Sequence, residues 1–353
     1  MRQTFMRALG VLLDPFLRLK RRFPLPFYIL GRAAAMVVML FVFGMAVFAL
    51  MDIIPGDAVS RARARVAAVE YRYEWTQEQV DMLREREGLD QPFFAQYFRW
   101  LARALRGDMG VTLIWGAPVA FLIRQRLLNT LLLSAISLAI TSAVAFALGI
   151  FFSSKAGSRA DLAGSFATLL ALSIPPLVVL LGLQFFAFVT GLFPVVGYPR
   201  FPFWYDRVAF VFSYIRHVFI LVLANLIIGA GVSLRMTRAL MLDQVGLPYM
   251  ISLRSRGISE RRVFFVHAFR NALNPFVSWV GVQIAGMLAG SIMLETIFAY
   301  PGIGLLMVQA VLEQDVNLIM AILLVASAAV MVAMLLADIA LAFLDPRVRY
   351  GKG

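Results

Sequence analysis

The chain has 353 residues, of which 61% are hydrophobic and only 15% are charged, with a mean hydropathy of +0.82. Soluble domains carry about 25% charged residues, so this composition argues strongly against a water-soluble enzyme. Cysteine is absent and the two histidines, His217 and His267, lie far apart, which argues against disulfides and metal centres. The formal net charge of +13 first indicates membrane topology, because basic residues accumulate in cytoplasmic loops.

Six stretches are apolar and long enough to cross about 30 Å of hydrocarbon as helices. We therefore expect an all-α integral membrane protein with six transmembrane helices. The predicted elements, in chain order, are a basic amphipathic helix on the inner leaflet (1–31), span 1 (32–53), an external helical segment (54–126), span 2 (127–154), span 3 (162–191), span 4 (208–234), a cytoplasmic loop (235–270), span 5 (271–297), an external turn (298–315), span 6 (316–344) and a cytoplasmic tail (345–353).

The charges between the spans predict the orientation. With both termini in the cytoplasm, the inside segments (1–32, 153–161, 235–270 and 338–353) hold 19 Lys and Arg against 6 Asp and Glu, whereas the external segments (52–126, 200–217 and 295–315) hold 14 of each. This bias predicts an N-in, C-in topology. The whole positive excess then lies on the cytoplasmic face, so the basic composition indicates membrane orientation, and no nucleic-acid partner is expected.

The external segment carries local signals for two helices. Thr76 with Gln79 resembles a capping box, and Gly88 is suited to end that helix. Pro92 is suited to start a second helix. We expect this second helix to pack through one face formed by Phe94, Tyr97, Leu101, Ala104 and Leu105. The segment is predicted to form a small helical lid rather than an independent domain.

Spans 3 and 5 contain helix-altering residues. Pro175 and Pro176 are expected to kink span 3, which otherwise forms one helix ending near Gly191. Span 5 has small residues at four- to five-residue spacing, namely Gly281, Ala285, Gly286 and Gly290. Such a face permits close helix packing, and the sequence leaves open whether it packs or lines a pathway.

Glu295 lies at the end of span 5, close to Pro301 and Gly302. A charge is costly at mid-membrane, so we expect this acid at the outer mouth, in contact with substrate, a gate or the lid.

The cytoplasmic loop is basic and interrupted. Gly257 is predicted to separate two short helices, of which Ser259 is suited to cap the second. The chain has no phosphate-binding motif of the form G-x-x-x-x-G-K-[ST]. We therefore expect that the chain is not an enzyme. It would be either a pore-forming subunit driven by another protein or a channel.

Several spaced motifs resemble one family, the permease subunits of bacterial ABC importers of the dipeptide, oligopeptide and nickel group. The loop residues that carry the resemblance are Tyr249, Arg254, Gly257, His267, Ala268, Arg270, Asn271, Ala272, Leu273 and Pro275. The segments Pro55-Gly56-Asp57, Ser173-Ile-Pro175-Pro176, Glu295-Thr-Ile-Phe298 and Leu344-Asp345-Pro346-Arg347 match the family pattern in the same order. Leu253 departs from the small residue usual at its place.

The resemblance implies a type I importer permease fold in the bacterial inner membrane. Its implied partners are membrane lipid, a second homologous permease, two cytosolic ATPases that bind ATP and Mg²⁺, and a periplasmic solute-binding protein, with no cofactor in this chain. The implied ATPase-coupling residues are Tyr249, Arg254, Arg256, Gly257, Glu260, Arg261, Arg262, His267 and Arg270. Helix packing or the pathway would involve Pro175, Gly281, Gln283, Gly286 and Gly290, and a periplasmic gate would involve Glu295, Pro301 and Gly302.

The expected cargo is a di- or oligopeptide carried by alternating access. Relatives within this group also carry nickel chelates, glutathione or oligosaccharides. A stand-alone channel or secondary carrier is the alternative of another class, and a structural or receptor subunit is a third.

Overall fold

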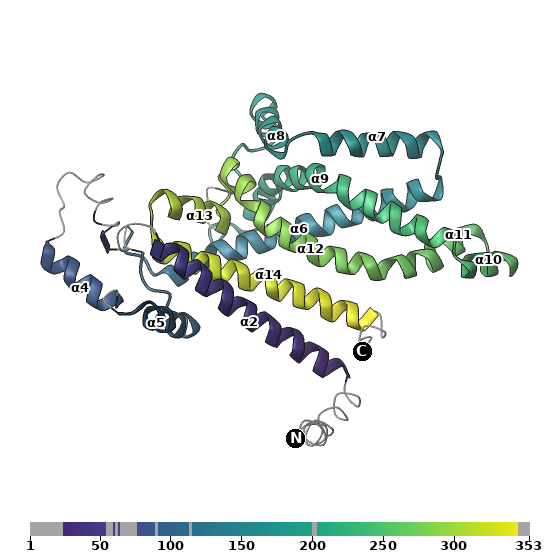
Figure 1. Ribbon diagram of the computed structural model, residues 1–353. Coiled ribbons are helices and arrows are strands. Elements are labelled where there is room, and N and C mark those ends of the chain that lie inside the picture. The colour runs from purple at the N-terminus through teal and green to yellow at the C-terminus, as the bar shows by residue number, and fades with distance from the viewer. Residues whose placement is uncertain are drawn as a thin grey trace, which may run out of the picture.

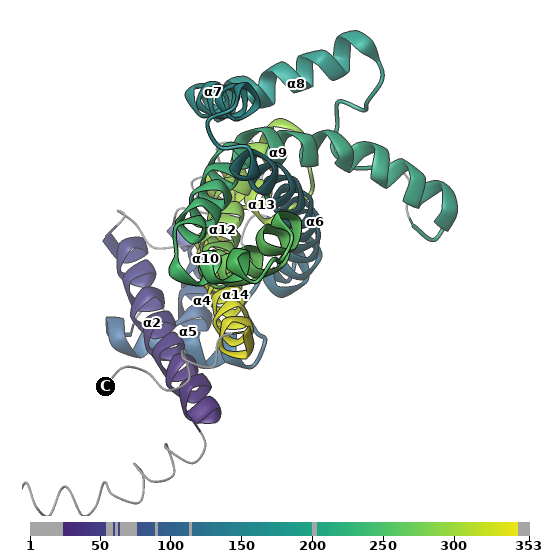
Figure 2. The same cartoon turned by 90° about the vertical axis from the view of Figure 1, so that its right-hand side faces the viewer.

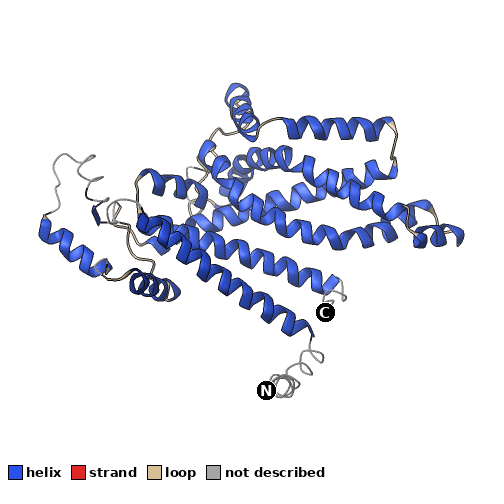
Figure 3. Ribbon diagram, in the orientation of Figure 1, coloured by secondary structure: helices blue, strands red, loops and turns tan. Residues whose placement is uncertain are grey.

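The structure is a computed structural model that describes residues 24–53, 59, 60, 63, 76–88, 91–112, 115–199 and 203–344. Within these residues the regular elements are helices, accompanied by one isolated antiparallel bridge between Val111 and Pro118 (Figure 3). The expected all-α class is therefore confirmed. The cytoplasmic tail and most of the predicted N-terminal amphipathic helix lie outside the described residues.

Four described helices are long and apolar enough to cross a membrane: α2 (Pro24–Ile53), α6 (Val119–Ser154), α9 (Arg207–Val245) and α14 (Val316–Leu344). A fifth crossing results if the bent pair α7 (Arg159–Ser173) and α8 (Pro176–Thr190) is counted as one span. A further long helix, α12 (Phe269–Ile297), packs against α6, α9 and α14.

The long helices run side by side, and short helices gather at both ends of the bundle (Figure 1). One end holds α10 (Pro248–Ser255) and α11 (Glu260–Arg262), and we call it the α10 end. The opposite end, called the α13 end, holds α4 (Gln77–Glu87), α5 (Phe93–Leu105) and α13 (Ile303–Leu312). The helix α2 packs along α14, while α8 and the first turns of α9 project away from the bundle (Figure 2).

Span 3 differs most from its prediction. We expected one kinked helix, but α7 ends at Ser173, α8 begins at Pro176, and the two helices are bent by 93°. The cause is the pair of consecutive prolines. Pro175 forces Ile174 into an extended conformation, and neither proline offers an N–H to continue the helix. Gly191 ends α8 in a left-handed conformation, as expected.

Several helices extend beyond their predicted boundaries. The helix α9 continues to Val245, so Arg235 and Arg238, which we had placed in the cytoplasmic loop, are helical. Likewise α6 begins at Val119, before Arg124 and Arg126. The predicted boundaries were set where charge begins. Charge marks the edge of the hydrocarbon, but arginine is a good helix former and does not end a helix.

The external turn (298–315) contains a helix that the sequence analysis missed. The helix α13 spans Ile303–Leu312, and the chain then turns through Gln314, which has a positive φ of 56°. Asp315 follows, and its carboxylate accepts the N–H of Leu318 at 3.1 Å. This carboxylate therefore caps the start of α14.

The two helices predicted in the external segment are present. Thr76 and Gln79 form the expected capping box of α4, and Gly88 ends that helix in a left-handed conformation. The next helix, α5, begins directly after Pro92. Its buried residues are Tyr97, Trp100 and Ala104. Phe94 and Leu105, which were expected on this face, are instead 61% and 81% exposed.

Candidate functional site

A hollow of about 750 Å³ lies between α8, α9 and α12. It brings together two predicted pathway residues, Gln283 and Gly286, with Pro176, the neighbour of the predicted Pro175. The rest of its wall is mostly apolar and is formed by Leu177, Leu180, Ile228, Val232, Met287, Ile292, Met293, Leu294 and Ile297. Among the described residues that line it, none is charged.

Two amide side chains supply polar groups to this hollow. The Asn225 Nδ2 donates to Ser137 Oγ of α6 at 3.1 Å, and the Gln283 Nε2 donates to Ser233 Oγ of α9 at 3.1 Å. Each serine thus holds one amide in place. Because their amide oxygens accept hydrogen bonds, these two residues can address the N–H groups of a solute without a fixed charge.

The glycines of α12 have different surroundings. A Cβ at Gly281 would lie 3.0 Å from Ala337 Cβ, so this glycine permits close packing of α12 on α14. A Cβ at Gly286 would meet nothing within 4 Å, and Gly286 lines the hollow. Close helix packing and a place in the wall of the hollow therefore fall on different glycines. The surroundings of Gly290 lie outside what the structure describes.

Glu295 is fully buried at the α13 end. Its carboxylate accepts hydrogen bonds from Thr130 Oγ1 at 2.7 Å and from the backbone N–H groups of Gly304 at 2.7 Å and Leu305 at 3.1 Å. The last two are unpaired donors of the first turn of α13, where a negative charge is favourable. Glu295 therefore caps α13 from the preceding helix α12.

The other two predicted gate residues surround this carboxylate. A Cβ at Gly302 would overlap the Glu295 carboxyl group, so the site requires glycine for space. The carbonyl of Pro301 accepts the Nδ2 of Asn129 at 2.8 Å, and Thr130 Oγ1 accepts the Ile303 N–H at 2.8 Å. Neighbouring residues of α6 thus connect to both α12 and α13, and the three helices meet at one polar centre.

Tyr300 belongs to the same centre and was missed in the sequence. Its hydroxyl donates to the Asn129 carbonyl at 3.0 Å and lies 3.0 Å from the hydroxyl of Tyr214 in α9. Burial raises the pKa of Tyr300, so its hydroxyl stays protonated and can donate. Tyr300 therefore links the start of α9 to the Glu295 centre.

At the α10 end, the interrupted loop has the predicted break. The helix α10 ends at Ser255, and Gly257 adopts a left-handed conformation with φ of +73°. Its N–H donates to the Arg254 carbonyl at 2.9 Å. Ser259 lies at the cap position of α11, but its side chain makes no capping hydrogen bond. A six-residue π-helix, Val263–Ala268, then joins α11 to α12.

The loop has a buried side and an exposed side. Met250, Val263 and Phe264 pack with Ile150 and Met241, which fixes the loop to α6 and α9. On the outside, Arg254 pairs with Glu260 through two contacts of 2.8 and 3.3 Å.

The exposed side gathers most of the predicted coupling residues. Tyr249, Arg256, His267 and Arg270 line one hollow of about 310 Å³, while Arg261 and Arg262 are exposed beside it. The structure thus presents a mostly basic surface that is fixed from beneath.

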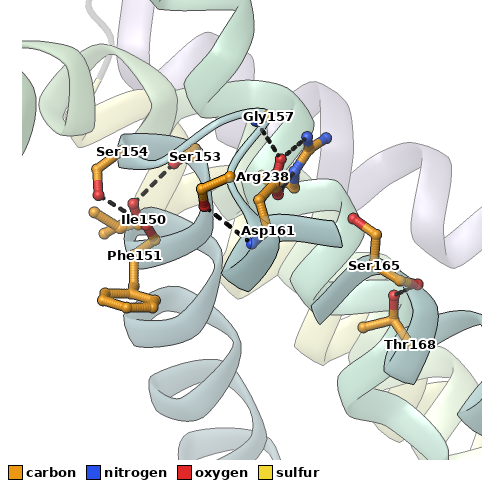
Figure 4. A network of polar contacts seen from close by, with 10 residues as sticks. Ile150, Phe151, Ser153, Ser154, Gly157, Asp161, Ser165, Thr168 and Arg238 are labelled. Carbon is orange, nitrogen blue, oxygen red and sulfur yellow. Dashed lines mark hydrogen bonds and ion pairs between the residues drawn. The ribbon is translucent and has the colours of Figure 1, made fainter. Parts of the chain in front are cut away.

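An ion pair close to this loop was also missed. The guanidinium of Arg238 in α9 donates from Nε and Nη2 to the two carboxylate oxygens of Asp161 in α7, at 2.7 and 2.8 Å (Figure 4). Asp161 also accepts the Gly157 N–H at 2.9 Å, and its own N–H donates to Ser158 Oγ at 3.3 Å. The S-x-x-D pattern of 158–161 is the signal that predicts a cap, but nothing local identifies Arg238 as its partner.

Comparison with known proteins identifies the family. A model described as the binding-protein-dependent transport system inner membrane component matches residues 145–350, and a model of the N-terminal part of such components matches residues 25–114. The oligopeptide transport system permease protein AppB of Bacillus subtilis is 33% identical over 277 residues, which cover 75% of this chain and 84% of the relative. The probable peptide ABC transporter permease protein y4tP of Sinorhizobium fredii is 29% identical over 324 residues, or 92% of this chain and 99% of the relative. The chain therefore belongs to the family of binding-protein-dependent transport system inner membrane components, as a permease of the peptide ABC importer group.

Proposed function

We propose that this chain is the permease subunit of an ATP-driven importer that moves di- or oligopeptides across the inner membrane of a bacterium. The observation that carries the proposal is the hollow between α8, α9 and α12. Its volume of about 750 Å³ falls within the range of about 300–1,000 Å³ typical of small-molecule sites. Apolar walls with two anchored amides suit a solute whose side chains vary and whose backbone offers amide groups. The peptide names of the relatives support the same cargo over nickel chelates, glutathione or oligosaccharides.

The proposed topology has six spans with both termini in the cytoplasm. The spans are α2, α6, the bent pair α7 and α8, α9, α12 and α14. The α10 end then faces the cytoplasm, and the α13 end faces the periplasm. The excess of basic residues in the segments at the α10 end supports this orientation.

The basic surface around α10 is proposed to dock on a cytosolic ATPase. Two such subunits would bind ATP and Mg²⁺, so this chain needs no cofactor and no ATPase site of its own. Gly257 permits the turn after α10, and the Arg254–Glu260 ion pair stabilises it. The residues around His267 form the hollow proposed to bind the ATPase. A second homologous permease and a periplasmic binding protein would complete the complex, and movement of the docked loops would drive alternating access.

The remaining predicted residues are proposed to act along the path. Gln283, Gly286 and the break after Pro175 border the hollow, while Gly281 serves helix packing. Glu295, Pro301 and Gly302 would hold the periplasmic gate together. Glu295 would act by capping α13, since its carboxylate is engaged by protein donors.

A paired substitution tests the proposal. Gly286→Trp should fill the hollow and reduce peptide uptake at least tenfold in liposomes that contain the complete complex with its ATPases and binding protein. The matched control is Gly31→Trp, at an exposed position of α2 where a side chain likewise meets nothing within 4 Å. Equal uptake by both variants would refute the proposal that the solute passes through this hollow.

Two further results would refute the function as a whole. Uptake by this chain alone without ATP would identify a channel or secondary carrier. Absence of uptake by the complete wild-type complex would favour a structural or receptor subunit.

A further inference from the structure

The helix α5 packs against the middle of the membrane-spanning helix α2. The hydroxyl of Tyr97 in α5 donates to the carbonyl of Phe41 at 2.9 Å. A Cβ at Gly44 would lie 3.1 Å from this hydroxyl, so the glycine permits the close approach. The apolar stretch of α2 ends at Leu50. With a rise of 1.5 Å per residue, Phe41 lies about 14 Å inside that stretch. The contact is therefore far from the end of the span.

Beyond its buried face, α5 has two different flanks. One flank is apolar and carries Phe94, Phe98 and Leu105, which are 61%, 52% and 81% exposed. The opposite flank carries Arg99, which is exposed, and the half-buried Gln96 and Arg103. This division into an apolar and a basic side is typical of helices that lie in a membrane interface.

The apolar flank is turned toward the middle of α2. The ring of Phe98 lies 6.0 Å from that of Phe41. The rings of Phe93 and Trp100 instead lie 5.3 and 6.3 Å from Phe48, which is closer to the α13 end of the span. Arg99, on the polar flank, packs against Gly88 at the end of α4. Hence the apolar flank of α5 lies nearer the middle of α2, and its basic flank lies nearer the α13 end of that helix.

The span itself is apolar and exposed at the level of this contact. Val37, Val38 and Val42 of α2 are 62%, 61% and 59% exposed. They belong to the apolar stretch of the span and, like Phe41, which contacts Phe98, they precede Phe48 in the chain. Acyl chains that cover α2 at this level therefore reach the apolar flank of α5 as well.

We propose that α5 is immersed in the membrane leaflet at the α13 end, with Phe94, Phe98 and Leu105 in contact with acyl chains. Its basic flank faces the headgroups. The segment expected to form a small helical lid is then anchored in the bilayer through its second helix. This inference depends on α2 crossing the membrane and is independent of the cargo and of ATP coupling.

Single cysteines provide a direct test, because the chain contains none of its own. Spin labels at Phe98→Cys, and separately at Phe94→Cys and Leu105→Cys, are measured in the complete complex in liposomes. The control is Glu78→Cys, at an exposed position of α4. We expect labels on the apolar flank to collide with oxygen several-fold more, relative to a water-soluble nickel chelate, than the control label does.

Three results would overturn the proposal. The first is equal access of the nickel chelate to position 98 and to the control. The second is protection of position 98 only when the binding protein is added, which would assign the flank to that protein. The third is disagreement among the three flank positions in assembled complexes, because the proposal places all three in one lipid-facing surface.

Discussion

Replacing Arg238 should destabilise the protein more than replacing its partner Asp161. The side chain of Asp161 is 5% exposed, whereas that of Arg238 is 29% exposed and lines an open hollow of about 470 Å³. In Arg238→Met, the carboxylate loses both guanidinium contacts and stays buried. In Asp161→Asn, the guanidinium keeps one neutral acceptor and its access to water. The two halves of the same ion pair are therefore not equivalent.

The burial of the two side chains predicts which substitution costs more, and typical values for such contacts give the size of each loss. Removing the partner of a fully buried charge costs about 3–5 kcal/mol. Because Arg238 is 29% exposed and Asp161 keeps the Gly157 N–H, we expect the lower end, about 3 kcal/mol, for Arg238→Met. Weakening a charged hydrogen bond while keeping its geometry costs about 1.5 kcal/mol, the value expected for Asp161→Asn. The double variant Asp161→Leu with Arg238→Met removes both charges. Since apolar replacement of a buried pair is often neutral, it should lie within about 1 kcal/mol of the wild type.

Thermal unfolding in detergent measures these differences, and the fluorescence of Trp279, which lines the same hollow, reports on the site. At about 2 °C per kcal/mol, the midpoint should fall by about 6 °C for Arg238→Met. It should fall by about 3 °C for Asp161→Asn. Equal shifts for the two single variants would refute the burial argument. A double variant as unstable as the sum of the two singles would show that the pair does not act as a unit.

The other predictions concern glycines and the Glu295 centre. Gly302→Ala should lower the free energy of unfolding by about 1–3 kcal/mol because its Cβ overlaps the Glu295 carboxyl, while Gly286→Ala should leave it unchanged or higher. Equal melting temperatures would contradict this. Gly257→Val should reduce co-purification of the ATPases, because a branched residue resists the left-handed conformation, whereas Gly257→Asn should retain it. Thr130→Val should cost about 1–3 kcal/mol in thermal unfolding and Thr130→Ser much less, since the hydroxyl serves a buried carboxylate; equal losses would exclude this role.

Local signals predicted local structure well. The structure contains the capping box of Thr76 and Gln79, the stop at Gly88 and the start after Pro92. The first two depend on hydrogen bonds within a few residues, and the third depends on the fixed φ of proline. The break at Gly257 is of the same kind. Such features can be read from sequence because the partners are neighbours in the chain.

Contacts between distant residues could not be predicted in this way. Asp161 and Arg238 occupy different helices and lie 77 positions apart in the chain. Glu295 was correctly recognised as unusual from the cost of its charge. Its engagement by the first turn of α13 was not predicted, because that helix was itself missed in a stretch assigned as a turn.

The three helices around the hollow of about 750 Å³, α8, α9 and α12, differ in how regular they are. Within the described residues, α8 begins at a two-proline break, and α12 contains Pro275 and follows a π-helix. The helix α9 has no internal proline over its 39 residues, which corresponds to a rod of about 58 Å. Sharp bends occur at such irregularities and rarely elsewhere. We therefore expect a change in the shape of the hollow to begin at the irregular points of α8 and α12. The helix α9, which carries Tyr214 near one end and Arg238 near the other, would bend only around Gly229 and Gly231.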